Sequence, residues 1–337
     1  MTDARRLATA VAALGIVLGG VALAALFVGS AGLSPSAVAR ALVGRAEASS
    51  VEAIVTLSLR LPRVAAAVLA GGALAVAGVG FQALTRNPLA EPSVLGISSG
   101  AAFGVVLAQI VGLRTGLVAA LGVTAFAFAG ALLAAAIVYL VATAPGGLAV
   151  QTLLLAGVIV GIFFSAAITV IISVVDFNRL SGVIHWLLGN LGPMPAGSLA
   201  LFAALAAGGV WLILRHAREL NLLELGEEAA SQLGVDAERL KRRVFMAAAL
   251  LTGTVVAFTG PIGFVGLIVP HVLRGLVGQD NRLLVPTSAL AGGAFLLAAD
   301  TLARNVVAPA ELSVGVITAF CGAPFFVWVL RTRSRSA

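Results

Sequence analysis

The chain has 337 residues, of which 60% are hydrophobic and only 10% are charged, and its mean hydropathy is +1.10. So few polar side chains cannot cover the surface of a soluble domain, so soluble enzymes and soluble binding modules are excluded. The net charge of +7 does not indicate a nucleic-acid partner, because the basic residues cluster at the ends of apolar runs, where they orient membrane helices.

Ten apolar runs, most of them near the roughly 20 residues that cross about 30 Å of hydrocarbon, follow one another along the chain. They predict an all-α, polytopic membrane protein in which residues 1–337 form one transmembrane domain. Glycines and prolines interrupt several runs, which favours close packing and the broken helices of transporter cores. The predicted spans are 7–28, 61–84, 94–111, 117–141, 152–174, 199–214, 244–259, 262–277, 284–299 and 313–330.

Basic residues are distributed unequally between alternate loops. With the N-terminus in the cytoplasm, 14 of the 21 Lys and Arg residues fall on the cytoplasmic side and seven fall outside. This asymmetry predicts that both termini are cytoplasmic, because loops rich in Lys and Arg stay inside. The same orientation places the loop between the sixth and seventh spans in the cytoplasm.

That cytoplasmic loop is the most highly charged part of the chain. Residues 215–243 carry six basic and six acidic side chains, so their net charge is zero. A dense but neutral block indicates a folded docking surface and not a phosphate-seeking tail.

Two short segments share a pattern. Residues 90–94 (AEPSV) precede the third span and residues 310–314 (AELSV) precede the tenth, on opposite predicted faces of the membrane. An inverted repeat would produce this arrangement, with Ser93 and Ser313 as N-caps of their helices. Chance similarity in a chain rich in apolar residues is the other interpretation.

Few residue patterns indicate chemistry within the chain itself. The only lysine, Lys241, follows Leu240, so the Gly-Lys pair that holds phosphates in ATPases is missing. His185, His216 and His271 are scattered without a second ligand at helical spacing, which favours packing or interfacial roles over a metal site. We therefore expect no cofactor, no metal and no ATP hydrolysis in this chain, and its single cysteine excludes a disulfide framework.

Two blocks of sequence carry more specific motifs. The first, 60–102, contains RLPR at 60–63 and Gln82 followed by NPLA at 87–90. The second runs over 260–286, 297–304 and 310–331, and contains GPIGF at 260–264 and Pro270-His271. In this combination the chain resembles, over nearly its whole length, the permease subunits of type II ABC importers. These FecCD-type permeases carry iron-siderophores, haem and cobalamin.

The resemblance implies an assembly. Two permease copies, here expected as a homodimer, enclose a translocation path in the bacterial or archaeal cytoplasmic (inner) membrane. Two ABC ATPase subunits that use ATP-Mg dock on the cytoplasmic side, and an extracytoplasmic substrate-binding protein delivers the cargo. Membrane lipid is the remaining partner. Alternating access would then move a bulky metal chelate inward.

Within 215–243, the resemblance implies that residues 222–234 form the segment that couples the permease to the ATPase. Its leucines and alanines would enter a groove while flanking charges set the register. A solvated amphipathic connector is the alternative. The candidate coupling residues are Leu222, Leu223, Leu225, Gly226, Glu227, Glu228, Ala229, Leu233 and Gly234.

On the outer side, the resemblance implies that Arg60, Arg63 and Arg304 pair with two glutamates of the binding protein. We expect these arginines to be solvent-exposed, so that they register the partner more than they add affinity. Anchoring of helix ends at lipid headgroups is the alternative.

The resemblance also places much of the cytoplasmic gate at 146–160, where small residues let helices slide past one another. Helix packing explains those glycines equally well. The candidate path and gate residues are Gln82, Asn87, Ser98, Ser99, Gly146, Gly147, Gln151 and Thr152.

Two rival functions remain open to the sequence. An ion-coupled secondary carrier suits broken helices and a repeat, but it needs carboxylates buried among the spans, and only Asp300 lies near one. An intramembrane enzyme lacks a convergent nucleophile, base or metal set. An ATP-driven importer permease is therefore the favoured interpretation.

Overall fold

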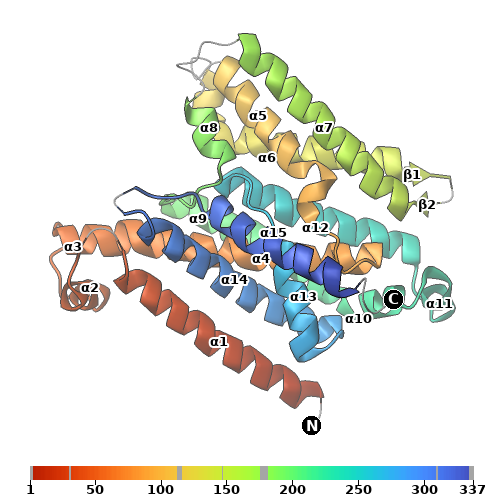
Figure 1. Cartoon of the computed structure of the whole chain (residues 1–337), viewed down its shortest axis with the longest axis horizontal. Coiled ribbons are helices and arrows are strands. Elements are labelled where there is room, and N and C mark those ends of the chain that lie inside the picture. The colour runs from red at the N-terminus through yellow and green to blue at the C-terminus, as the bar shows by residue number, and fades with distance from the viewer. Residues whose placement is uncertain are drawn as a thin grey trace.

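The structure is a computed structural model that describes residues 3–29, 32–111, 116–145, 147–174, 181–308 and 310–333. Within these ranges it consists of helices and one two-stranded hairpin, so the all-α prediction is confirmed (Figure 1). The elements are α1 (Asp3–Phe27), α2 (Pro35–Leu42), α3 (Val51–Ala53), η1 (Ile54–Arg60), α4 (Leu61–Thr85), η2 (Pro92–Leu95), α5 (Ile97–Val111), α6 (Gly116–Ala142), β1 (Thr143–Ala144), β2 (Gly147–Leu148), α7 (Val150–Val174), α8 (Ser181–Leu187), α9 (Ala196–Arg215), α10 (Ala217–Glu224), α11 (Glu227–Gln232), α12 (Ala237–Thr259), α13 (Val265–Val277), α14 (Asn281–Asn305) and α15 (Val314–Arg333).

The described residues contain eight helices long and apolar enough to cross a membrane, and two shorter apolar helices, at 97–109 and 265–277. Each overlaps one of the ten predicted spans. The second span is longer than predicted, because α3, the π-helix η1 and α4 continue without a break from Val51 to Thr85. The eighth span begins later than predicted, at Val265, because Phe264 adopts a left-handed backbone conformation (φ 68°) at the end of the preceding loop.

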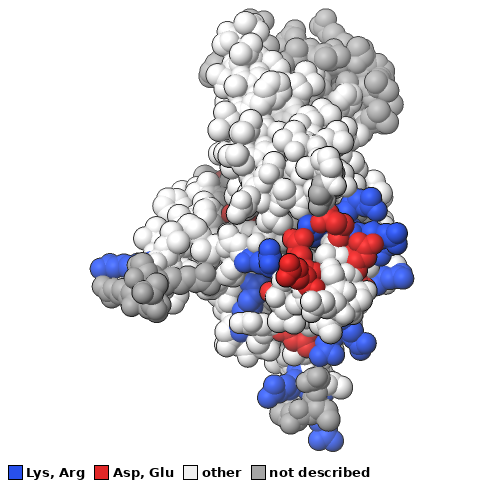
Figure 2. Space-filling view, turned by 90° about the vertical axis from the view of Figure 1, so that its right-hand side faces the viewer, with Lys and Arg blue, Asp and Glu red and all other residues white. Residues whose placement is uncertain are grey.

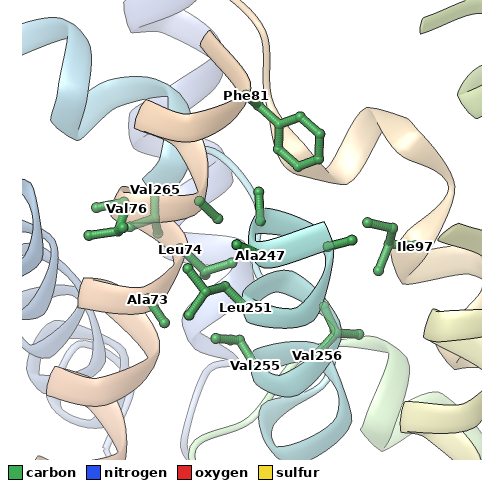
Figure 3. Packing of buried hydrophobic residues seen from close by; sticks show 14 of the residues in the cluster. Ala73, Leu74, Val76, Phe81, Ile97, Ala247, Leu251, Val255, Val256 and Val265 are labelled. Carbon is green, nitrogen blue, oxygen red and sulfur yellow. The ribbon is translucent and has the colours of Figure 1, made fainter. Parts of the chain in front are cut away.

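Helix α4 occupies the centre of the molecule. It packs against α9, α12, α13 and α14, and nearly all of its second half is buried. Figure 3 shows Leu74 of α4 beside Ala247, Leu251 and Val255 of α12 within one continuous apolar core. Because α4 and the helices around it are packed into this core, the two ends of α4 are held in fixed positions.

Glycines allow the central helices to approach closely. Gly71 of α4 faces Gly292 of α14 so closely that a methyl group on either would overlap the other's backbone, and a methyl group on Gly78 would overlap the carbonyl of Gly266 in α13. Small residues at such crossings are the usual means by which membrane helices pack.

Two groups of helices flank this centre. Helices α5, α6 and α7 pack on one another beside α12, and α1 runs along α14 on the opposite side (Figure 1). Helices α1, α7, α9 and α15 are mostly exposed apolar surface. Lipid or other subunits must therefore cover these faces.

The prediction that Ser93 caps a helix is wrong. Ser93 lies inside η2, where Glu91 is the preceding residue and Pro92 the first, and Gly96 in a left-handed conformation separates this turn from α5. Ser313 does precede α15, but its hydroxyl donates to the carbonyls of Leu188 and Gly189. The inverted repeat stays a prediction.

Candidate functional site

Polar side chains gather at the two ends of α4, which is otherwise apolar. At its first turn, the guanidinium of Arg63 donates to both carboxylate oxygens of Asp300 (3.0–3.2 Å) and to Glu311 (2.8 Å). Arg304 Nε lies 3.1 Å from Asp300 Oδ2, one turn along α14, although the angle is poor for a hydrogen bond. Asp300 is completely buried. Its charge is balanced by two arginines, as burial requires.

The predicted docking arginines do not have the expected exposure. Arg60 and Arg304 are each only 5% exposed, and the Arg63 side chain is 12% exposed. Asp300 draws Arg63 and Arg304 inward, while Arg60 donates to the carbonyl of Leu26 at the end of α1 (2.6 Å). The expectation of freely solvated arginines is therefore wrong, because intramolecular acceptors hold them.

These three arginines still reach a common cavity. A pocket of about 370 Å³ is bordered by all of them, by Glu311 and by the segment between α8 and α9. The structure therefore brings the three predicted residues together at one site, even though it buries most of each side chain.

At the other end of α4, Gln82 ties three segments together. Its amide donates to the carbonyls of Gly266 (3.0 Å) and Ala90 (3.3 Å), and its oxygen accepts from Arg274. Gln82 is buried, with all of its polar atoms engaged. It holds the loop after α4 against α13, and this geometry suits a positioning role better than direct contact with cargo.

The other predicted path residues do not form one cluster. Asn87 is exposed and caps its own turn by accepting from Leu89 N–H (3.0 Å). Gln151 and Thr152 are exposed in the first turn of α7, Ser98 is half-buried in α5, and Gly146 lies outside the described residues. Ser99 lines a groove of about 480 Å³ with Ser93, Gly96 and the exposed face of α7 from Gly157 to Thr169.

The predicted coupling segment folds as the end of α10, the short helix α11 and the turn before α12. Its apolar residues divide between two faces, because Leu223 and Ala230 are buried in the core whereas Leu225 and Leu233 are 69% and 61% exposed. The prediction that Leu223 belongs to an exposed apolar face is therefore wrong. Glu228 and Gly234 are exposed, and Leu222, Gly226, Glu227 and Ala229 are half-buried.

Charges surround this exposed face. In Figure 2, acidic side chains gather in a patch that lysine and arginine side chains flank. A pocket of about 500 Å³ here is bordered by Glu227, Glu228, Asp236 and Glu238. Leu225, Leu233 and this acidic rim give the segment the mixed character of a protein-docking surface.

Sequence reasoning missed an ion cluster around a buried lysine beside this surface. The ammonium of Lys241 donates to Glu227 Oε2 (3.0 Å) and to the carbonyl of Leu148 (2.9 Å), and pairs with Glu238. The spacing of Glu238 and Lys241 on one helix predicts their pairing. The contact with Leu148, 93 residues away, leaves no trace in the sequence.

Two acidic groups fix the position of α10 relative to α14. Asp280 caps α14 and accepts from Arg282 and from Asn221 (2.8 Å); these hydrogen bonds, chiefly from Arg282, lower the pKa of Asp280 to about 2. Burial raises the pKa of Glu224, against the opposing effects of Asn281 and Arg274.

The described residues contain no group of three or more His, Cys, Asp and Glu side chains that could hold a metal. His216 Nδ1 lies 2.9 Å from Glu219, and His271 packs edge-on against Phe325. These are a local side-chain pair at the start of α10 and a packing contact.

The sequence matches the model of the FecCD transport family over residues 16–332. It is 44% identical over 280 residues to the cobalamin import system permease protein BtuC of Halobacterium salinarum, covering 83% of this chain and 74% of that protein. It is 43% identical over 283 residues to the hemin transport system permease protein HmuU of Yersinia pestis, covering 83% and 84%.

A solved structure described as an inward-facing, metal-chelate type ABC transporter has the same fold, with a TM-score of 0.81 and 28% identity over 96% of this chain and 99% of that chain. The family match covers most of the chain, and the ten apolar helices agree with it. This chain belongs to the FecCD transport family, a family of multi-pass membrane permeases.

Proposed function

We propose that the chain is the permease subunit of an ATP-driven importer that moves a bulky metal chelate across the cytoplasmic membrane. The observation that carries this proposal is the family match over residues 16–332, together with relatives above 40% identity named for cobalamin and hemin import. Cobalamin, haem and ferric siderophores are the cargo classes, and the binding protein selects among them.

In this proposal ATP is hydrolysed by a separate subunit that docks on α10 and α11. The exposed leucines Leu225 and Leu233 enter the partner, and the acidic rim pairs with its basic groups. Both termini lie on the same cytoplasmic side as this surface.

A second copy of the chain completes the path. The groove that contains Ser99 and the exposed face of α7 would line the passage, because hydroxyls and glycines offer a wide and weakly binding surface. The binding protein docks at the arginine pocket on the outer side, where Glu311 is half exposed. Closure of the two ATPase subunits then shifts the permease pair between outward and inward access.

The rival ion-coupled carrier requires a carboxylate that is free to take a cation at depth. Among the described residues Asp300 is the only fully buried carboxylate, and Arg63 already neutralises it. That pairing favours the ATP-driven proposal.

The proposal is tested by purifying the tagged chain from its own host in mild detergent and identifying the proteins bound to it. An ABC ATPase should copurify, and Leu225→Asp with Leu233→Asp should release it, whereas Leu276→Asp, an exposed leucine of α13 outside the coupling segment, should not. The cognate extracytoplasmic protein should bind cobalamin, hemin or a ferric siderophore. Failure of any ATPase to copurify with the unaltered chain would count against the proposal.

A further inference from the structure

The hairpin β1–β2 lies immediately before α7. Side chains of helix α12 bind the main chain of this hairpin. Leu148 uses both of its backbone polar groups for this contact: its N–H donates to Glu238 Oε2 (2.7 Å) and its carbonyl accepts from Lys241 Nζ (2.9 Å). Two side chains of α12 thus take the place of a third strand at the hairpin edge. We call Lys241, Glu238, Glu227 and the main chain of Gly147 and Leu148 the hairpin clasp.

The Lys241 ammonium at its centre is buried in a way that an ordinary surface ion pair is not. The side chain is only 3% exposed, yet Glu227 (3.0 Å), Glu238 and one carbonyl surround it. Charged hydrogen bonds of this kind are stronger than neutral ones, and losing the two carboxylates would leave the buried ammonium of Lys241 without compensation. The clasp therefore acts as one unit.

The hairpin also fits the clasp sterically. Gly147 has φ 107°, a conformation that favours glycine, and a methyl group there would overlap the carboxylate of Glu238. Only a residue without a side chain lets the Glu238 carboxylate lie against the hairpin and reach Leu148 N–H.

The clasp joins segments that are otherwise distant in the chain. Glu227 is the first residue of α11, in the coupling segment, and its other oxygen lies 4.0 Å from Arg86 at the end of α4. Leu148 stands two residues before α7. A movement of α11 must therefore either carry the hairpin with it or pull Glu227 away from the buried ammonium of Lys241.

Helix α7 is the natural receiver of such a movement. Most of its surface is exposed apolar side chains, so that fewer internal contacts resist its displacement than resist that of α4. Its groove-lining face includes Gly157, Gly161 and Ser165. Displacing the first turn of α7 would change the width of the groove.

We propose that the hairpin clasp transmits movement of the coupling segment to the first turn of α7, with Lys241 and Glu238 as positioning residues. This inference rests on the proposed function, since it supposes that an ATPase moves α11 and that α7 borders the path.

The test uses the permease purified with its ATPase subunits, reconstituted in proteoliposomes with the cognate binding protein. Uptake and ATP hydrolysis are measured together, with whichever of cobalamin, hemin and a ferric siderophore the unaltered complex transports. Lys241→Met should lower the ratio of molecules transported to ATP hydrolysed by at least about fivefold, the lower end of typical coupling between two sites. Lys241→Arg, which keeps a charged donor, should recover part of that ratio.

Matched controls separate the clasp from general effects. Arg239→Met removes a basic side chain two residues away that is exposed and pairs with Asp236, and it should leave the ratio unchanged. Gly147→Ala should reproduce the loss, whereas Gly278→Ala, at a similar positive φ but with open space around it, should not. Glu238→Gln provides a milder variant if Lys241→Met folds poorly, since that side chain is half exposed.

A second readout needs no transport. Hydrogen exchange of the peptide that contains residues 143–149 should speed up in Lys241→Met and Glu238→Gln, in the isolated permease and in the complex. If exchange rises while the unaltered and variant complexes transport with the same ratio, the clasp does not transmit movement and the inference is overturned. If the unaltered complex shows no ATP-dependent uptake at all, the proposed function itself fails.

Discussion

At position 300, a single buried carboxylate lies between two arginines from different helices. Asp300→Asn would leave Arg63 and Arg304 with a surplus of buried positive charge. Removing one partner of a buried ion pair costs about 3–5 kcal/mol. The free energy of unfolding in detergent should therefore fall by about this amount. Asp236→Asn, which removes an exposed pair with Arg239, should cost no more than about 1 kcal/mol. Equal losses in the two variants would contradict the account of this cluster.

Glu224 gives a prediction that depends on pH, and here replacing the acidic side chain should stabilise the protein. Because burial raises its pKa in the folded chain, the folded state holds its proton more tightly than the unfolded state does. Stability should therefore fall as the pH rises from the unfolded pKa, about 4.3, through the raised folded pKa. Glu224→Gln avoids a partly buried charge and should raise the melting temperature at pH 7.

The same variant should lose most of its advantage near pH 4, where the native glutamate is mostly protonated in both states. Glu228→Gln, the same change at an exposed position of α11, is the matched control. The measurement is a pair of thermal melts at each pH. A gap that persists unchanged at pH 4 would show that lost packing, and not ionisation, sets the effect.

At the scale of elements, the crossing of α4 and α14 depends on glycine. Gly71→Ala would place a methyl group against the Gly292 carbonyl, and overpacking of this kind costs about 1–3 kcal/mol. Gly208→Ala, on an open face of α9, should be neutral or slightly stabilising, because alanine favours the helix. Unfolding in detergent compares the two. A loss in Gly208→Ala as large as in Gly71→Ala would argue against the close crossing.

The helices that span the membrane were the easiest elements to predict, because a run of apolar residues needs no information from the rest of the chain. The ends of these helices were harder. The π-helix at 54–60 and the left-handed Phe264 depend on contacts with distant segments, such as the hydrogen bond from Phe264 N–H to Glu91. The hairpin formed by β1 and β2 was not predicted, because strands of two residues are too short to show an alternating pattern of apolar and polar residues.

For the site residues too, part of the prediction was possible from the sequence and part was not. The motif resemblance located Arg60, Arg63 and Arg304, and the structure gathers them at one pocket. Their burial could not be read from the sequence, because Arg63 meets Asp300 and Glu311 from the other end of the chain and Arg60 meets the carbonyl of Leu26. Likewise, the order of leucines from 220 to 225 could not show that Leu223 faces inward while Leu225 faces out.

At the scale of the whole molecule, the two polar clusters lie at opposite ends of one central helix. The arginine pocket stands at the start of α4, and Arg86 at its end reaches the hairpin clasp through Glu227. Between them α4 is almost entirely buried. A rigid core with a docking surface at each end suits a subunit that responds to partners on both sides of a membrane.

The division of labour between this chain and an ATPase is tested most directly in sealed vesicles. The permease is reconstituted with and without its ATPase subunits, and uptake of the transported chelate is measured with ATP or with an imposed proton or sodium gradient. We predict uptake only where the ATPase and ATP are both present, and none driven by a gradient through the permease by itself. Rapid gradient-driven uptake by the permease without its ATPase would contradict the account.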